Sequence, residues 1–187
     1  MPDKTNILNV TTLAKTKMFT IEQVDLKFAN GQTRSFERLK SGPRRSVMIA
    51  AVDDNNNVLL VKEYAAGTGR YELGLPKGLV ESDETIFAGA NRELQEEVGF
   101  IAEKIIEITQ MTLAPNYMSH KSYLVLATGL SPSKLEGDEP EPLEIVTCSI
   151  NKINEMIFSQ QISEARSIAG LYIIRDYLHD LQSSRTS

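Results

Sequence analysis

Three glutamates, Glu93, Glu96 and Glu97, stand at positions i, i+3 and i+4 of a segment with helical patterning. An α-helix turns about 100° per residue, so the three carboxylates would fall within an arc of roughly 100° on one face. Like charges spaced in this way weaken an isolated helix, so we expect a cation to offset them. Hard divalent cations such as Mg²⁺ prefer carboxylate oxygens and often join them to substrate phosphates. The spacing therefore predicts metal-assisted chemistry on a phosphate.

The same glutamates belong to a longer pattern. Its defined positions are Gly78, Glu84, Arg92, Glu93, Leu94, Glu96, Glu97, Gly99 and Phe100. They match the Nudix box, G-x5-E-x7-R-E-U-x-E-E-x-G-U, where U is a bulky aliphatic or aromatic residue, without a gap. A chance match in a chain of this length has a probability on the order of 10⁻⁷. A solvated acidic helix face would explain the glutamates alone but not the whole box, so the chain resembles the Nudix family.

The resemblance implies a set of metal ligands. These are Glu93, Glu96 and Glu97, and the backbone carbonyl of Lys77, just before the box glycine, joins them in the family. Gly78 would let the chain bend closely at this point. The implied cofactor is Mg²⁺, with Mn²⁺ as the alternative, and the ligands Glu93 and Glu97 are expected to be catalytic.

Arg92 is cationic and adjacent to the three glutamates. The family uses this arginine in catalysis to orient the glutamates and the preceding loop through charge-assisted hydrogen bonds, not to bind substrate. Glu84 lies eight residues earlier, within reach of Arg92 but away from the Glu93 face. We interpret Glu84 as a structural residue rather than a metal ligand.

Hydrolysis also needs a general base, which the box does not supply. The acidic segment EGDEPEP, residues 136–142, precedes an expected strand and is restricted by two prolines. A solvated acidic loop is the plain alternative, but ADP-ribose pyrophosphatases of the family carry acidic residues at the same place. By this resemblance, Glu139 is the expected base and Glu141 a further metal ligand. Glu136, Asp138 and Glu141 remain alternatives for the base.

Other nucleophiles and bases are less suited to this chemistry. His120 lies in a polar loop without an obvious carboxylate partner, and His179 falls on the last expected helix. Cys148 lies in the alternating apolar run EIVTCSI, which is typical of a small residue in a strand. No Ser–His–Asp or Cys–His arrangement is evident.

Composition limits the class of protein. The chain has 187 residues, of which 41% are hydrophobic, enough for one domain with a small extension. Its net charge of −5 disfavours a general nucleic-acid binder. A single cysteine, no apolar signal segment and no run of about 18 apolar residues favour a cytoplasmic protein that does not enter a membrane.

The first part of the chain is expected to be β-rich. Residues 19–28 and 32–39 alternate in polarity and flank Asn30-Gly31, which is a strong signal for a type I′ hairpin turn. We therefore predict an N-terminal β-rich extension, residues 1–43, followed by a hydrolase domain, residues 44–187. In related ADP-ribose hydrolases such extensions are exchanged in a homodimer and complete the nucleotide site.

The domain itself is predicted to be an α/β fold. Strands are expected at 45–52, 58–64, 103–112, 121–128 and 143–150, and helices at 84–98, 151–159 and 163–182. The helix at 84–98 carries most of the Nudix box and is called the box helix. Ser82 or Asp83 would cap its start and Gly99 would end it. Residues 67–78, before the helix, would form a loop rich in glycine. An apolar stripe from Ile86 to Val98 would pack that helix on a mixed sheet. The resemblance implies the same Nudix α/β/α sandwich.

The substrate is less well determined. Pro115 lies close to the proline that marks ADP-ribose hydrolases of the family, and Tyr117 lies near the tyrosine associated with dinucleoside polyphosphate hydrolases. The chain is also similar over nearly its full length to hydrolases of ADP compounds, through segments such as YELG and LEGDEPEPL. This implies a small-molecule nucleotide substrate, among ADP-ribose, diadenosine triphosphate and NADH, with release of AMP. The alternatives are a hydrolase of nucleotide sugars or nucleoside triphosphates, and a non-catalytic nucleotide-binding domain.

Overall fold

The computed structural model describes residues 5–40, 42 and 44–185, and the chain divides into two compact units. The first unit combines residues 1–43 with the segment Thr112–Lys121. The second unit comprises Arg44–Met111 and Ser122–Ser187 and contains the whole Nudix box.

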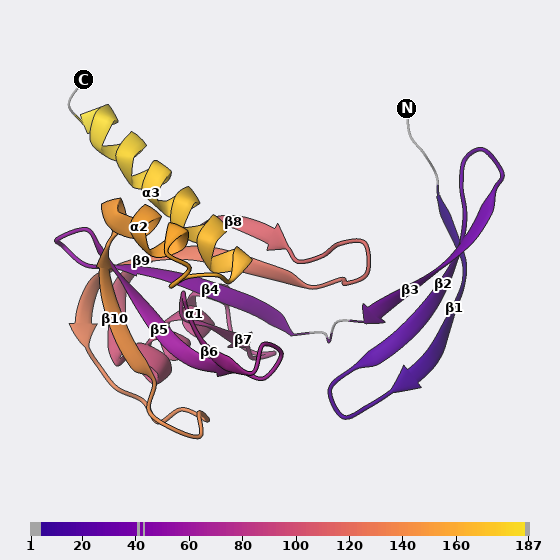
Figure 1. Ribbon diagram of the computed structural model, residues 1–187, viewed down its shortest axis with the longest axis horizontal. Coiled ribbons are helices and arrows are strands. Elements are labelled where there is room, and N and C mark those ends of the chain that lie inside the picture. Colours follow the sequence, from indigo (N-terminus) through magenta and orange to yellow (C-terminus); the bar gives the residue numbers. More distant parts are fainter. Residues whose placement is uncertain (1–4, 41, 43, 186–187) are drawn as a thin grey trace. The chain divides into compact units, whose positions relative to one another are not determined.

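A seven-stranded sheet forms the centre of the second unit (Figure 1). Its strands are β4 (Arg45–Val52), β5 (Asn57–Ala65), β6 (Arg70–Gly74), β7 (Lys77–Val80), β8 (Phe100–Thr112), β9 (Lys121–Pro132) and β10 (Glu144–Ser149). The main order is β10-β5-β4-β9-β8, with β6 paired to β5 and β7 paired to β4. Strand β4 runs parallel to β9 and antiparallel to β5, so the sheet is mixed, as predicted.

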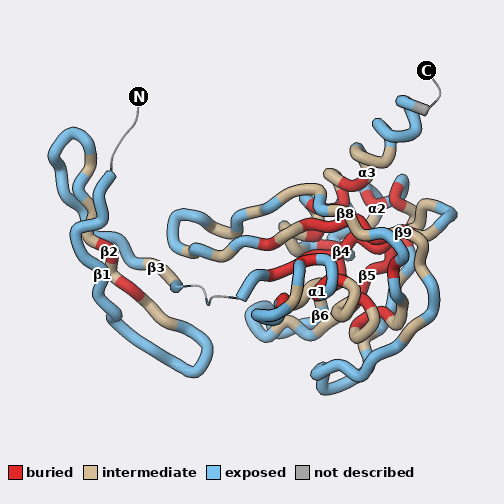
Figure 2. Tube along the Cα trace, turned by 180° about the vertical axis from the view of Figure 1, so that it is seen from behind, coloured by how far each residue is buried: buried red, intermediate tan, exposed pale blue. Residues whose placement is uncertain are grey.

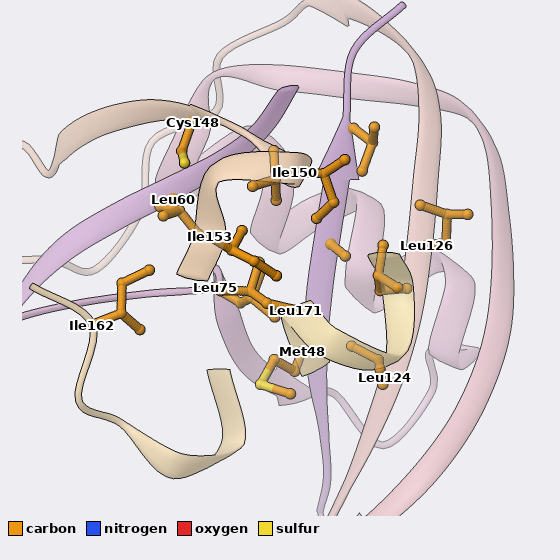
Figure 3. Packing of buried hydrophobic residues seen from close by; sticks show 14 of the residues in the cluster. Met48, Leu60, Leu75, Leu124, Leu126, Cys148, Ile150, Ile153, Ile162 and Leu171 are labelled. Atoms are coloured by element: carbon orange, nitrogen blue, oxygen red, sulfur yellow. The ribbon is translucent and has the colours of Figure 1, made fainter. Parts of the chain in front are cut away.

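Helices cover both faces of this sheet. They are α1 (Ile86–Glu93) with its continuation η1 (Leu94–Val98), then η2 (Ile150–Lys152), α2 (Ile153–Phe158) and α3 (Ala165–Arg185). Alternate residues of β4 enter two separate apolar clusters, one containing Leu171 and Ile174 of α3, the other containing Ala90 of α1 and Leu94 of η1. Figure 3 shows the first cluster between Met48 and the C-terminal helices. The predicted α/β/α sandwich is therefore confirmed.

The central strands are apolar because they are buried on both faces. From Ser46 to Val52 every residue of β4 is buried, and Figure 2 shows burial concentrated on β4, β5 and β9. The other predicted strands and helices are present, with ends shifted by a few residues.

The first unit contains a three-stranded antiparallel sheet, β1 (Asn6–Lys15), β2 (Thr20–Lys27) and β3 (Thr33–Lys40), in that order. The predicted hairpin joins β2 to β3, but its turn is not type I′. Gly31 alone in the turn has a positive φ, of 82°, whereas type I′ needs positive φ at both central residues. The N–H of Phe28 donates to the carbonyl of Gln32 at 2.9 Å, so the loop is longer than two residues.

The box helix begins and continues differently from the prediction. The Thr85 hydroxyl, and not Ser82 or Asp83, accepts the capping hydrogen bond, from Ala88 N at 3.1 Å. Leu94–Val98 form a π-helical turn instead of further α-helix. Gly99 ends the turn as predicted, with φ of 81° and its N–H bonded to the carbonyl of Leu94 at 3.1 Å.

The glycine-rich segment before the box is not only a loop. Strand β6 lies within it and pairs with β5, and β7 begins at its end and pairs with β4. The frequent glycines suggested a loop, but pairing with neighbouring strands supplies the backbone hydrogen bonds that a short segment cannot supply alone.

Candidate active site

An acidic cavity of about 590 Å³ lies in the second unit. Strand β7, the box helix and the loop before β10 all contribute to its lining. Its carboxylates are Glu81, Glu93, Glu96, Glu97, Glu136, Asp138 and Glu139, and its cations are Arg44, Lys77 and Arg92. Seven acidic side chains against three basic ones leave the cavity negative, which favours a bound cation.

Glu97 is the most deeply placed of these carboxylates, with a relative exposure of 6%. The π-helical turn carries it, and its Oε2 accepts a hydrogen bond from the backbone N–H of Lys77 at 3.1 Å. Burial raises the pKa of Glu97 to about 8, although the nearby Lys77 acts in the opposite direction. A π turn is rare and is often found at functional sites, which agrees with its place here.

Glu93 packs directly against Gly78 of β7. A Cβ atom at position 78 would lie 2.0 Å from the Cδ of Glu93, so no other amino acid fits there without moving this carboxylate. Burial raises the pKa of Glu93, although Arg92 partly offsets that effect. The box glycine therefore makes room for the half-buried carboxylate of Glu93.

Arg92 connects the acidic residues of the box. Its guanidinium donates to Glu93 Oε1 at 2.9 Å and to Glu96 Oε2 at 2.8 Å. It also donates to Glu84 Oε1 at 2.9 Å and to the carbonyl of Leu79 at 2.8 Å. The bond to Glu84 is the main reason why the pKa of Arg92 is raised. These contacts match the orienting role expected of Arg92 and the structural role expected of Glu84.

The residues present fit a divalent metal ion. Among the described residues, no three His, Cys, Asp or Glu side chains already stand as a metal-binding group, and Arg92 bonds both Glu93 and Glu96. However, Glu97 is buried, Glu93 is half-buried, and both have raised pKa values, so ionising both without a cation is costly. The atoms of Glu93 and Glu97 that could coordinate a metal ion are all carboxylate oxygens, which suits Mg²⁺ or Mn²⁺.

The loop before β10 brings Glu139 to the same cavity. Burial raises the pKa of Glu139, and the nearby Glu63 and Asp138 raise it further. Glu136 and Asp138 also line the cavity, so three of the four candidates for the base reach it, and Glu141 does not. The raised pKa of Glu139 is a property that suits a general base.

Glu141, the further ligand expected from the sequence, lies elsewhere. Its carboxylate accepts a hydrogen bond from the Tyr71 hydroxyl. It lines a separate cavity of about 270 Å³ together with Lys62, Pro142 and Glu144. This position gives no support to Glu141 as a ligand beside Glu97.

Two site features were missed from the sequence. The Lys77 ammonium, and not only its backbone, lies in the cavity and pairs with Glu63 of β5 at 2.5 Å. Arg44 also lines the cavity and pairs with Glu81 at 3.5 Å. The sequence held one signal for the Lys77–Glu63 pair. The apolar run of β5 ends in two charged residues, Lys62 and Glu63, and charged residues at the end of a buried strand can face a site.

The rejected nucleophiles lie outside the cavity lining. Cys148 is buried in the core, and burial raises the pKa of its thiol. His179 is on α3, 3.9 Å from Asp180.

The first unit has a cavity of its own, of about 480 Å³. Phe28 and Phe36 line it with their ring centroids 6.3 Å apart in an edge-to-face arrangement. Pro115 and Tyr117, the two substrate markers, line the same cavity.

Comparison with known proteins agrees with this geometry. Residues 42–168 match the NUDIX domain, and residues 6–38 match the NudE-type Nudix hydrolase N-terminal domain. The chain is 42% identical to the ADP compounds hydrolase NudE of Escherichia coli (strain K12) over 175 residues, covering 94% of each chain. It is 28% identical to the ADP-ribose pyrophosphatase of Bacillus subtilis (strain 168), covering 88% of this chain and 91% of that one.

The structural comparison finds a protein of the same kind. The crystal structure of an ADP compounds hydrolase matches with a TM-score of 0.89 at 42% sequence identity, covering 95% of this chain and 96% of that chain. Among the described residues, no helix combines the length and the apolar character needed to cross a membrane.

Proposed function

The chain belongs to the Nudix hydrolase family, and from that premise we propose that it hydrolyses the pyrophosphate linkage of compounds containing ADP and releases AMP. The observation that carries this proposal is the acidic cavity, in which Glu93 and Glu97 of the box share one space with Glu139. Similarity to an ADP compounds hydrolase over 94% of the chain supports the substrate class.

The residues of the cavity have different proposed roles. Glu93, Glu96 and Glu97, with the Lys77 carbonyl, would hold Mg²⁺ or Mn²⁺, which when bound would screen the phosphate charge and acidify water. Arg92 orients Glu93 and Glu96 through its hydrogen bonds. Arg92 therefore acts through the carboxylates that it holds.

Glu139 is the proposed general base. It takes a proton from the attacking water as the water oxygen bonds to one phosphorus and the bond from that phosphorus to the bridging oxygen breaks, so that the bridging oxygen leaves as an anionic oxygen of the other phosphate product. The raised pKa of Glu139 suits a group that must accept this proton and later release it. Glu141 is left out of this assignment because its carboxylate is bonded to Tyr71.

Hydrolysis of a substrate panel tests the proposal. The panel comprises ADP-ribose, NADH, diadenosine triphosphate, GDP-mannose and dGTP, each with Mg²⁺, with Mn²⁺ and with EDTA, and the products are separated by chromatography. We expect AMP from the adenosine compounds, and no AMP with EDTA. Pyrophosphate from dGTP, or preferred cleavage of GDP-mannose, would instead support the alternative substrates. No turnover by folded protein would support a non-catalytic nucleotide-binding role.

A variant of Glu97 tests the metal assignment. Glu97→Gln should abolish turnover while the fold survives, because it removes a charged ligand but little packing. Glu107→Gln, at an exposed residue of β8, is the matched control and should retain activity. Circular dichroism and thermal melting check folding, and undiminished turnover by Glu97→Gln would refute the assignment.

We further propose that the protein is a cytoplasmic homodimer that does not bind nucleic acid or enter a membrane. The single cysteine suits a reducing compartment, and the net charge of −5 disfavours binding to nucleic acid. The exposed apolar residues of β1 support association with a second copy.

A further inference from the structure

The loop that carries Glu139 has no regular structure between β9 and β10. Its first part is fixed to the box helix. Leu135 N donates to the carbonyl of Gln95 at 3.3 Å, and Lys134 Nζ donates to the carbonyl of Glu96 at 2.6 Å. This side of the loop is therefore held by the same helix that carries the proposed metal ligands.

A second attachment lies beyond Glu139. The Tyr71 hydroxyl of β6 donates to the Glu141 carboxylate across 70 residues of sequence. Tyr71 pairs with Tyr64 of β5 in the sheet, and the two rings meet edge to face with centroids 5.4 Å apart. The hydroxyl thus projects from a ring that the sheet and a neighbouring ring hold in place.

The segment between Glu139 and this attachment is stiff. In the run Glu139-Pro140-Glu141-Pro142, both prolines have a fixed φ, and each glutamate precedes a proline and is restricted to extended backbone. An extended segment of this kind rises about 3.1 Å per residue, so the Cα atom of Glu141 is only roughly 6 Å along the chain from that of Glu139. A displacement of Glu141 is therefore transmitted to Glu139 instead of being absorbed between them.

We propose that Tyr71 is a positioning residue, which through Glu141 holds the loop where Glu139 reaches the acidic cavity. This rests on the proposed function, in which Glu139 is the base. Two attachments, one on each side of Glu139, fix a loop that has no strand or helix of its own. Glu141 then serves as an anchor and not as a metal ligand.

Removal of one hydroxyl tests the proposal. Tyr71→Phe keeps the ring and its contact with Tyr64 but cannot donate to Glu141. We expect kcat for ADP-ribose to fall about tenfold with KM nearly unchanged, because small misplacement of a catalytic group is costly. Tyr64→Phe, at the paired exposed tyrosine, is the matched control and should keep wild-type kcat.

Variants of Glu141 show whether this residue anchors the loop or binds a metal ion. Glu141→Ala should match Tyr71→Phe, and the double variant should be no slower than either single one, because both remove the same contact. Glu141→Gln should recover most of the rate, since its carbonyl oxygen still accepts from the hydroxyl. All of these variants should need the same Mg²⁺ concentration as wild type for a half-maximal rate. A raised Mg²⁺ requirement in both Glu141 variants, but not in Tyr71→Phe, would overturn the proposal in favour of a ligand.

Hydrogen exchange gives a readout that does not depend on turnover. Tyr71→Phe should speed exchange of the Leu135 amide, which is bonded to the carbonyl of Gln95 at the other attachment of the loop, and Tyr64→Phe should not. If wild type releases no AMP but this difference in exchange is seen, the proposed function fails and the attachment of the loop stands. If wild type is active and Tyr71→Phe matches Tyr64→Phe in both exchange and kcat, the positioning role of Tyr71 is refuted.

Discussion

At the scale of single residues, the acidic cavity depends on a glycine as much as on its carboxylates. Gly78 lies so close to Glu93 that a methyl group would overlap its carboxylate carbon. The position of Glu93 therefore depends on a residue that has no side chain of its own.

The variant Gly78→Ala tests this dependence. It should displace Glu93 and reduce kcat by roughly 10² or more, because ligands must be held within a fraction of an ångström. Gly67→Ala is a suitable control, since nothing lies within 4 Å of a Cβ built there. Isothermal titration with Mg²⁺ and rate measurements on both variants check the expectation. Wild-type Mg²⁺ affinity in Gly78→Ala would show that Glu93 has room to adjust.

The assignment of the base can be tested among three neighbouring acids. Glu139→Gln should lower kcat by roughly 10² or more with little change in KM, as expected for loss of a general base. Glu136→Gln and Asp138→Asn should have smaller effects, because they change the charge of the cavity without removing the base. If Asp138→Asn shows the largest loss, the base is Asp138.

Residues of the box were predictable because their types and spacing are local in sequence. The motif indicated Glu93, Glu97 and Arg92 without any knowledge of strand pairing. The Glu63–Lys77 ion pair and the Tyr71–Glu141 contact were not predictable in this way. Each depends on which strands lie side by side, and a single sequence does not state this.

At the scale of elements, helix α3 fixes the segment that leads into the box. Glu164 Oε2 accepts from the N–H of Ser167 at 2.7 Å and from its hydroxyl at 2.9 Å, which caps the first turn. The same hydroxyl oxygen accepts from Leu75 N at 3.0 Å, and Ser167 is buried. The start of α3 is thereby connected to the chain two residues before Lys77.

This cap predicts a dependence of stability on pH. Burial alone would raise the pKa of Glu164, but Arg166 and Ser167 hold it below the ordinary value of 4.5. A lowered folded-state pKa stabilises the fold above the unfolded-state pKa, and this contribution is lost as the pH falls through the folded value. Glu164→Gln should therefore be less stable than wild type at pH 7, by on the order of 1 kcal/mol, and the difference should shrink below about pH 4.5.

Denaturant unfolding of both proteins at several pH values measures this difference. Glu155→Gln, at an exposed residue of α2, is the control for loss of one negative charge. A gap between wild type and Glu164→Gln that stays constant with pH would contradict the role of the Glu164 charge.

The box helix shows why some local structure escapes prediction. Its apolar stripe and Gly99 indicated a helix of the right length, but the spacing was interpreted as α-helical to the end. The π turn at Leu94–Val98 widens the last turn, and the same apolar residues are compatible with either form. The hydrogen bond from the N–H of Gly99 to the carbonyl of Leu94, which spans five residues, distinguishes the π form from the α form.

At the scale of the whole molecule, strand β1 is an unprotected edge. Within the part of the chain that the structure describes, it pairs with β2 alone, and all ten of its residues are exposed, including Ile7 at 60% and Leu8 at 56%. Edge strands with exposed apolar side chains are sites of association. We therefore expect a second copy of the chain to cover this strand.

Light scattering at micromolar concentration should give about twice the chain mass of 20.8 kDa. Leu8→Lys should lower the dimer fraction, because it places a charge on the proposed interface. Thr12→Lys adds the same charge at an exposed polar residue of β1 and should have a smaller effect. A monomeric mass for wild type would rule out a stable homodimer.

The class of fold was predictable at this scale, but the connections were not. Apolar runs and helical periodicity indicated a mixed sheet covered on both faces. They did not show that Thr112–Lys121, from the middle of the chain, belongs to the first unit. That segment is polar, and its place depends on pairing such as Leu39 with Met118.

The parallel pairing of β4 with β9 also has a consequence during synthesis. Ser46 pairs with Ser122 and Ala51 with Ala127, so the ribosome must deliver the intervening chain before the central pair can form. Until then the nascent chain exposes an apolar strand with an open edge, the kind of surface that chaperones shield. Such distant pairing slows folding. Chains stalled before residue 121 should therefore be degraded or aggregate, even though they already carry the complete Nudix box.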